Sequence, residues 1–490
     1  MIIDMLHNLA KYLPEVKAPE AAPSTKDRLI WTGIALILYF MMYETTAFGV
    51  NMSTAGVDFL QTITASRTGS ILTAGIGPIV LASIFLQLFV GAGILNLNLK
   101  DKNDKQKFLE VQKILAIILA VVEGFIFVYF SKLPLVAIAG INPAMVMALV
   151  VAQIALGSVA VLYLDEVVTK YGLGSGISLF IAAGVSFAVI LGVMNLIAGP
   201  TGVVSIMSEG GAESLSNSLL ALMPFLFTIV VFLAVVYAES LKVEIPIAFE
   251  RVRGMVPKLP LKFFYVSNIP VIFASALIIN VQLFAGAALV DQYWVKSTSA
   301  PTNDVLAGYS FEKHGILPVI GYVDNTGHLR DGILYMFTPV YGEGKSTIEH
   351  WNFITSTPTP LFHIPEYVHA LIYILMLSVI SVLFGMFWVE ISNMDAKSVA
   401  GQLSDSGIQI PGFRRDPRML EQILNKHIFP LTVMGSFCVG LLAGLADLTG
   451  ALGTGTGILL SVGILHRMYE QLEQMQAFDL YPTLGKMFGN

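Results

Sequence analysis

The chain has 490 residues, of which 55% are hydrophobic and 13% are Asp, Glu, Lys or Arg, and its net charge is −6. Soluble domains contain about 25% charged residues, so this composition excludes a simple soluble enzyme and a disordered or fibrous protein. The single cysteine, Cys438, excludes an intrachain disulfide. The apolar residues form long runs, which are typical of membrane-spanning helices and not of the alternating strands of an outer-membrane barrel.

Ten runs are long and apolar enough to cross a bilayer as helices, and they predict an all-α polytopic membrane protein. The segment that precedes them, residues 1–28, lacks a long apolar core, so we expect no cleaved signal peptide. In chain order the runs cover residues 29–49, 76–96, 114–130, 143–164, 176–198, 220–238, 263–290, 368–389, 429–448 and 451–466. Glycines interrupt the fifth and tenth runs, which membrane helices tolerate.

The basic residues are distributed unevenly between the segments that separate the runs. If the N-terminus is cytoplasmic, the inner segments hold 22 Lys and Arg residues and the outer segments hold 6. Cytoplasmic loops carry such an excess of positive charge. We therefore expect both termini to lie in the cytoplasm.

Two of the outer segments are unusual. Residues 50–75 are too polar to span the membrane, yet they carry Val57, Phe59, Leu60 and Ile63, so they form either a short re-entrant helix or an ordinary external loop. Residues 291–367 form a long outer loop with a turn signal at residues 324–327. We expect this loop to fold into a small external cap, and its role is open.

Motifs for catalysis or cofactor binding are absent from the sequence. There is no HExxH, CxxC, GxSxG, Walker or dinucleotide-binding motif, so we expect neither an enzyme nor a bound cofactor or metal. The ten runs contain three acids, Glu44, Glu123 and Asp447, and no Lys or Arg. Glu44 and Asp447 are expected near the outer ends of their helices, where water reaches them. Glu123 lies deep and is either part of a proton relay or a structural hydrogen-bonding group.

Several long strings of the sequence resemble one family. The string ASRTGSILTAGIGPIVLASIFLQLFVGAG at residues 65–93 resembles the SecY family, the pore-forming subunits of the Sec protein translocon, in its archaeal form. Similar strings follow in the family's order at residues 163–186, 235–272, 384–403 and 450–472. The resemblance implies two inverted five-helix halves around an hourglass pore, an arrangement common among membrane transport proteins. It also favours the re-entrant interpretation, with a plug at about residues 52–73.

The resemblance divides the chain into four parts: a cytoplasmic segment at 1–28, helices 1 to 5 at 29–198, helices 6 to 10 at 199–466, and a cytoplasmic tail at 467–490. The first helical part contains the plug, for which the candidate residues are Val57, Phe59, Leu60, Ile63 and Arg67. The second contains the external loop.

A ring of aliphatic side chains is the candidate pore constriction. Ile76 and Val80 are four residues apart, as are Ile177 and Ile181, so each pair lies on one face of its helix. The resemblance implies that Ile272 and Leu460 complete the ring. A hydrophobic ring yields to a passing chain and opposes wetting. The alternative is that each of these residues faces lipid or a neighbouring helix.

The resemblance also implies a lateral gate between the second and seventh helices. Gln87 and Asn268 are polar residues of this gate and could hydrogen-bond across it, or they form static bonds elsewhere. Two basic cytoplasmic loops resemble ribosome-docking loops, which pair with ribosomal RNA phosphates. Their candidate residues are Arg251, Arg253, Lys258, Arg414 and Arg415. The alternative is that the positive-inside rule alone accounts for these charges.

The function implied by the resemblance is that of a passive protein-conducting channel in the cytoplasmic membrane. It would translocate secretory polypeptides that carry signal sequences and release membrane proteins sideways into the lipid. A ribosome or another partner would drive transport, and SecE-like and beta-type small subunits would complete a heterotrimer. The alternatives are a secondary transporter, which needs polar binding groups at mid-membrane, and an intramembrane hydrolase, which needs a nucleophile or an acid pair there.

Overall fold

The computed structural model describes most of the membrane-embedded chain. The described residues are 12–21, 23–51, 61, 64–91, 93–95, 97, 101–129, 133, 135–136, 140–199, 202–209, 214–246, 248–249, 258–289, 317–323, 329–340, 347–359, 362–405, 408–409 and 417–480.

The all-α prediction is confirmed, because each of the ten predicted runs coincides with a helix. The first five helices are α2 (Thr25–Glu44), α4 (Gly77–Gly91), α5 (Lys102–Tyr129), α6 (Pro143–Tyr171) and α7 (Gly176–Ala198). The second five are α10 (Met223–Ser240), α11 (Ile269–Leu289), α15 (Glu366–Ile391), α17 (Pro417–Leu448) and α18 (Gly455–Leu480).

Three of these helices extend well beyond the predicted runs. α5 and α17 begin about a dozen residues early, and α18 continues through most of the predicted tail. Hydropathy locates the bilayer, whereas a helix continues into water wherever its residues favour it. In the described chain, six helical stretches are long and apolar enough to span a bilayer, whereas α4 and the Ile269–Phe284 part of α11 are apolar but shorter.

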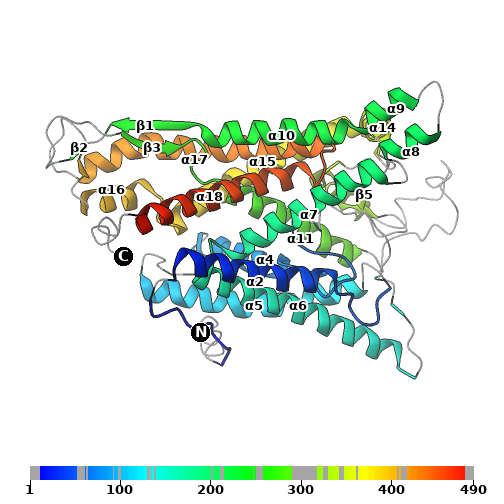
Figure 1. The fold of residues 1–490 in the computed structure, drawn as a ribbon, viewed down its shortest axis with the longest axis horizontal. Coiled ribbons are helices and arrows are strands. Elements are labelled where there is room, and N and C mark those ends of the chain that lie inside the picture. The colour runs from blue at the N-terminus through cyan, green and yellow to red at the C-terminus, as the bar shows by residue number, and fades with distance from the viewer. Residues whose placement is uncertain are drawn as a thin grey trace.

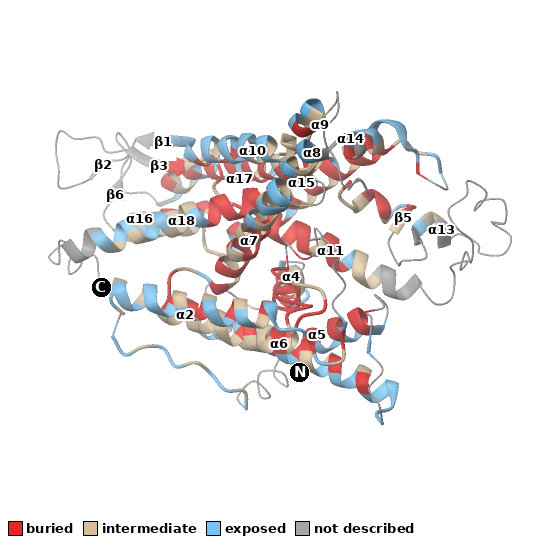
Figure 2. Cartoon of the chain, turned by 45° about the vertical axis from the view of Figure 1, so that its right-hand side comes forward, coloured by how far each residue is buried: buried red, intermediate tan, exposed pale blue. Residues whose placement is uncertain are grey.

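The helices form two halves that meet along the centre of the molecule. Figure 1 shows α2, α4, α5 and α6 in one half and α10, α15, α17 and α18 in the other, with α7 and α11 between them. α7 packs against α18, and α11 packs against α4. Buried residues concentrate where the halves meet, whereas α10 exposes most of its surface (Figure 2). A helix that is apolar all round and exposed suits contact with lipid.

The remaining described elements lie at the ends of the bundle. α8 (Val203–Glu209) and α9 (Ser214–Ala221) precede α10, and α16 (Ala396–Asp405) follows α15. The long outer segment contains α13 (Leu317–Ile320), β4 (Tyr322–Val323), β5 (Leu329–Asp331), the 3-10 helix η1 (Tyr335–Phe337) and α14 (Thr347–Ser356). β4 and β5 pair antiparallel and flank the predicted turn at 324–327, which lies outside the described residues.

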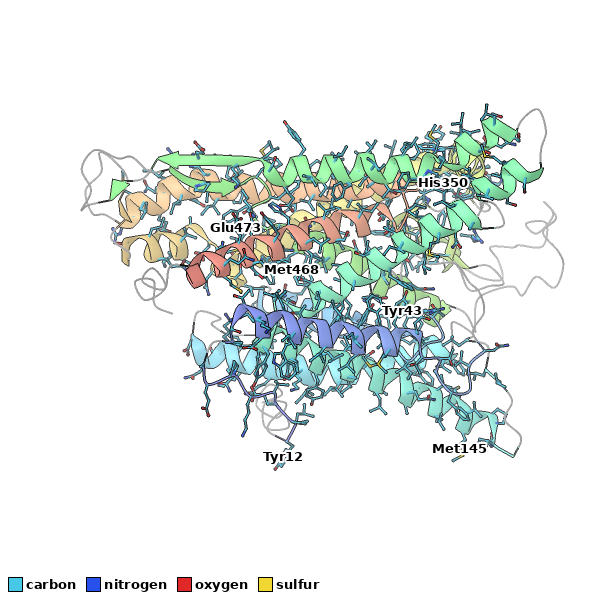
Figure 3. All side chains as sticks on the ribbon, viewed as in Figure 1. Tyr12, Tyr43, Met145, His350, Met468 and Glu473 are labelled. Atoms are coloured by element: carbon cyan, nitrogen blue, oxygen red, sulfur yellow. The ribbon has the colours of Figure 1, made fainter. Side chains whose placement is uncertain are left out.

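Buried polar contacts hold the described parts of residues 291–367 together, and one of them joins this segment to the end of α17. The Asp331 carboxylate, which is fully buried, accepts hydrogen bonds from the Gly332 and Phe362 N–H groups, both at 2.8 Å. His350 of α14, labelled in Figure 3, has its Nε2 atom 3.0 Å from the Leu448 carbonyl oxygen at the end of α17. The described parts of the cap are therefore folded onto the second half.

Two short β pairs organise the opposite end. β1 (Lys242–Pro246) pairs antiparallel with β3 (Lys258–Lys262), and β2 (Ala248–Phe249) pairs with β6 (Ile408–Gln409). Because β2 and β6 come from the two basic segments between helices, this second pair joins both segments edge to edge.

An ion pair ties the β1–β3 hairpin to α18. Lys262 of β3 pairs with Glu470, and His466 lies one turn away with its Nε2 atom 3.4 Å from the Glu470 carboxylate. Burial opposes ionisation of Glu470, but the hydrogen bond and charge of Lys262, together with His466 and Lys242, outweigh burial and lower the Glu470 pKa. A lowered pKa means that the folded state stabilises the carboxylate.

We predict that Lys262→Met loosens the hairpin by at most about 1 kcal/mol, because both partners are partly exposed. The stabilisation should be present above the unfolded-state pKa of about 4.3 and be lost as pH falls through the lower folded-state pKa. Hydrogen exchange of the β1–β3 amides, corrected for intrinsic rates, should be faster in the variant at pH 7 and equal to wild type below that pKa. Lys105→Met, on an exposed lysine of α5, is the matched control and should leave the hairpin unchanged.

Candidate functional site

The structure brings the six predicted ring residues into one hydrophobic cluster, although they come from four helices. Five are buried and the sixth, Ile177, is half-buried and packs against them. The first half contributes α4 and α7, and the second half contributes α11 and α18. The residues are Ile76, Val80, Ile177, Ile181, Ile272 and Leu460. Side chains fill the space between the two halves at this level (Figure 3).

The four helices present these residues close to their N-terminal ends. Ile76 directly precedes α4, and Ile177 is the second residue of α7. Ile272 lies in the first turn of α11, and Leu460 lies in the second turn of α18. The cluster is therefore formed where chains turn into helices, so the geometry of these turns sets the position of each side chain.

The chain reaches Ile76 through a tight turn of the re-entrant segment. The Ile76 N–H donates to the Thr64 carbonyl oxygen at 2.9 Å. Gly75 between them has φ +52°, and a Cβ atom on it would lie 2.2 Å from that same oxygen. Only glycine fits such a turn. The turn brings Thr64 back against Ile76, so residues 64–75 lie next to the cluster.

The described part of this segment is buried, unlike an ordinary external loop. Ala65 and Leu72 are fully buried, and the Tyr39 hydroxyl of α2 donates to the Ala65 carbonyl oxygen at 2.9 Å. Ala65 also lies against Gly184 of α7. The Tyr39 ring stacks on Phe180, with ring centres 4.9 Å apart. The re-entrant interpretation is thus confirmed for the described residues.

Of the predicted plug residues, the structure describes Arg67. Its guanidinium pairs with Glu44 at the end of α2 and lies 5.8 Å from the centre of the Tyr43 ring. Tyr43, labelled in Figure 3, packs edge-to-face on Phe187 of α7. Val57, Phe59, Leu60 and Ile63 lie outside the described residues.

Two of the three acids in the predicted runs, Glu123 and Asp447, are buried in different surroundings. Glu123 is buried, and its Oε2 atom lies 2.8 Å from where a Cβ on Gly77 would be, so the carboxyl group abuts the start of α4. Its Oε1 atom has no hydrogen-bond partner among the described residues.

The prediction that water reaches Asp447 is wrong, because this residue is only 5% exposed. Tyr373 of α15 covers it and donates to its carboxylate at 2.9 Å.

The two predicted gate amides are not joined to each other. The Gln87 amide donates to Ser83 Oγ in its own helix at 3.0 Å. The Asn268 amide donates to the Leu459 carbonyl oxygen of α18 at 3.0 Å, and both amide oxygens lack a partner in the described chain. Of the two alternatives, the structure therefore shows the static one, with each amide bonded away from the gate. The reason is geometric, since Ser83 lies one turn from Gln87 and Gly463 leaves a notch on α18 for the Asn268 side chain.

Of the predicted docking residues, the structure describes Lys258. Lys258 begins β3. Arg251, Arg253, Arg414 and Arg415 lie outside the described residues.

Sequence reasoning missed Tyr39, which anchors the re-entrant segment. A signal was available, because Ala35, Tyr39 and Tyr43 are spaced by four residues and form the buried stripe of α2. No comparable signal pointed to the Leu459 carbonyl oxygen as the partner of Asn268, since any backbone carbonyl could serve.

Comparison with known proteins gives one consistent result. Residues 70–469 match the SecY family model. A protein translocase subunit SecY from Methanococcus vannielii is 41% identical over 483 residues, which cover 98% of each chain. A solved structure described as that of a protein-conducting channel has a TM-score of 0.76 and 38% identity and covers 97% of this chain and 98% of that chain. Sec61 in the canine ribosome–channel complex of the endoplasmic reticulum has a TM-score of 0.73, with 38% identity and the same coverage.

We predict that Tyr39→Phe loosens the re-entrant segment. The change removes the hydroxyl donor and leaves the buried Ala65 carbonyl without its bond, which costs about 1–3 kcal/mol. Hydrogen exchange across residues 61–76 should be faster than in wild type. Tyr43→Phe is the matched control, because the phenylalanine ring keeps the contacts that the Tyr43 ring makes with Arg67 and Phe187. Equal exchange in both variants would show that the hydroxyl is not the anchor.

Proposed function

The chain belongs to the SecY family and is the channel subunit of a protein translocase, and from this premise we propose that the six aliphatic ring residues, which lie within the large central hydrophobic cluster, are the seal of the pore. The observation that supports this is the convergence of four helix starts, two from each half, on one apolar cluster. None of the six side chains has a hydrogen-bonding group, so the seal opposes wetting and binds no passing residue tightly.

We propose that the re-entrant segment is the plug beneath this seal. Residues 64–75 run directly into Ile76, so moving the segment would disturb the seal itself. The Tyr39 hydroxyl bond, the Arg67–Glu44 pair and backbone hydrogen bonds to Thr45 and Ala47 hold it. The exposed ion pair adds little energy. A plug held in this way is displaced by an arriving polypeptide and returns after it.

The contact between α4 and α11 is the proposed lateral gate, through which membrane segments leave for lipid. Gln87 bonds within α4, and Asn268 bonds to α18 of its own half. Parting α4 from α11 therefore breaks no hydrogen bond made by these amides. The gate is held shut by apolar packing, which an apolar signal sequence or a lipid chain replaces at little cost.

The charge and the hydrophobicity of different parts of the chain indicate its proposed partners. The basic residues Arg251, Arg253, Lys258, Arg414 and Arg415 would bind ribosomal RNA phosphates, in keeping with the ribosome in the Sec61 complex. The exposed apolar surface of α10 suits lipid or a small subunit of the SecE-like or beta type. The charge distribution supports cytoplasmic termini in the cytoplasmic membrane.

We predict that replacing Ile76, Ile177 and Ile272 together by Ser gives an assembled channel that leaks ions at rest. The seal would widen and hydrate, so resting conductance in reconstituted bilayers should rise above the wild-type level. The control replaces three exposed residues, Ile37, Ile118 and Ile190, by Ser. An assembled seal variant with wild-type conductance would contradict the assignment.

We also predict that Arg251→Glu with Arg253→Glu weakens ribosome binding and makes it less dependent on salt. For every phosphate that is no longer bound, the slope of log affinity against log salt should fall by about 1. Binding is measured by cosedimentation over a salt series. The control reverses two cytoplasmic charges elsewhere, Lys105→Glu with Lys107→Glu, and should keep the wild-type slope. If both pairs change binding equally, the effect is one of net charge and not of docking.

A further inference from the structure

The fourth and fifth helices of each half are joined by turns with the same sequence pattern. Leu173-Gly174-Ser175-Gly176 leads from α6 into α7, and Leu452-Gly453-Thr454-Gly455 leads from α17 into α18. The first glycine of each turn has a positive φ, +70° at Gly174 and +75° at Gly453. The second glycine is the first residue of the following helix. The two turns are thus built alike, although they belong to different halves.

In both turns a carboxylate from the preceding helix caps the next helix. Asp165 Oδ1 accepts the Ile177 N–H of α7 at 2.8 Å. Asp447 Oδ1 accepts the Thr456 N–H of α18 at 2.7 Å, and its Oδ2 accepts the Thr456 hydroxyl at 2.5 Å. The first N–H groups of a helix have no partner within it, and its N-terminus favours a negative charge. Each aspartate therefore supplies both a hydrogen-bond acceptor and a negative charge at the start of the helix that follows.

The second glycine of each turn makes this contact possible. A Cβ on Gly176 would lie 2.5 Å from the Cα of Asp165. A Cβ on Gly455 would lie 2.0 Å from the carbonyl carbon of Ala446, the residue before Asp447. Any side chain at these positions would push the two helices of the hairpin apart and separate the carboxylate from the helix start.

The capped helices are two of the four that carry ring residues near their starts. Asp165 holds the backbone N–H of Ile177, which is itself a ring residue, and Ile181 follows one turn later. Asp447 holds Thr456, and Leu460 lies one turn beyond it on the same face. Fixing the first turn of each helix therefore fixes the height and rotation of its ring side chains.

We propose that Asp165 and Asp447 are matched positioning residues, one in each half, that hold α7 and α18 so that their aliphatic side chains close the seal. This inference rests on the proposed seal. Neither aspartate touches the conducted chain. Each acts through the helix that it caps.

The test compares Asp165→Ala and Asp447→Ala with Asp165→Asn and Asp447→Asn in the full channel complex. Alanine removes the acceptor, so exchange of the first-turn amides of α7 or α18 should be faster by roughly two- to thirtyfold, the range that loss of a helix cap produces. The alanine variants should also conduct ions at rest. Asparagine keeps an acceptor oxygen and is an equally good cap, so both asparagine variants should exchange slowly and stay closed.

Asn142→Ala is the control, because Asn142 caps α6 by accepting the Ala144 N–H at 3.1 Å and α6 carries no ring residue. This variant should show faster hydrogen exchange at the start of α6 but no ion conductance at rest. Unchanged exchange in the alanine variants, or leak in the asparagine variants, would overturn the proposal. Faster exchange without leak, while the Ile76, Ile177 and Ile272 variant leaks, would refute positioning and leave the seal standing. If that variant does not leak either, the seal itself is wrong and the positioning role falls with it.

Discussion

The two halves of the molecule meet through aliphatic side chains that can neither donate nor accept a hydrogen bond, and the rest of the structure depends on this. Apolar contact is non-directional, so it closes the centre but does not determine the position of any helix there. Ile181 and Leu460 are fully buried in this contact. Their positions must be set by polar contacts made elsewhere.

The polar contacts described above lie within one half or the other. Tyr39 binds Ala65 and Asp165 binds Ile177 in the first half, whereas Asn268 binds Leu459 in the second. In the segment 291–367, His350 joins α14 to the end of α17 in the second half, and Asp331 joins two parts of the segment to each other. Each half is therefore fixed internally by directional bonds. The interface between them is free to part without breaking those bonds, which suits a channel that opens around a substrate.

Composition predicts the helices and period predicts which residues share a helix face, whereas the ring itself is implied by family resemblance. Long apolar runs mark all ten helices, and the spacing of Ile76 and Val80 is enough to put both on one face of a helix. The partners Ile272 and Leu460 come from family resemblance, because spacing within one helix says nothing about another helix. The helical extensions beyond the membrane are not predicted, since hydropathy reports the solvent and not the end of a helix.

Buried polar groups are the least predictable part of the site. Asp447 is expected near water because of its place at a helix end, but Tyr373 from α15 covers it. For Gln87 and Asn268 the sequence leaves two alternatives open, a bond across the gate or static bonds elsewhere, and the structure shows the static bonds. Such pairings depend on side-chain positions to within an ångström, which a pattern of residue types does not encode.

The β2–β6 pair gives the end of the molecule that carries the two basic segments a mechanical property. The two basic segments are joined there by a pair only two residues long in each strand. A load pulling on either segment is shared between α11, through the β1–β3 hairpin, and α15 and α17, which flank α16 and β6. Two-stranded pairs of this length are marginal on their own. The joint would therefore separate under a small force, and a pull on one segment would then no longer reach the helices that hold the other.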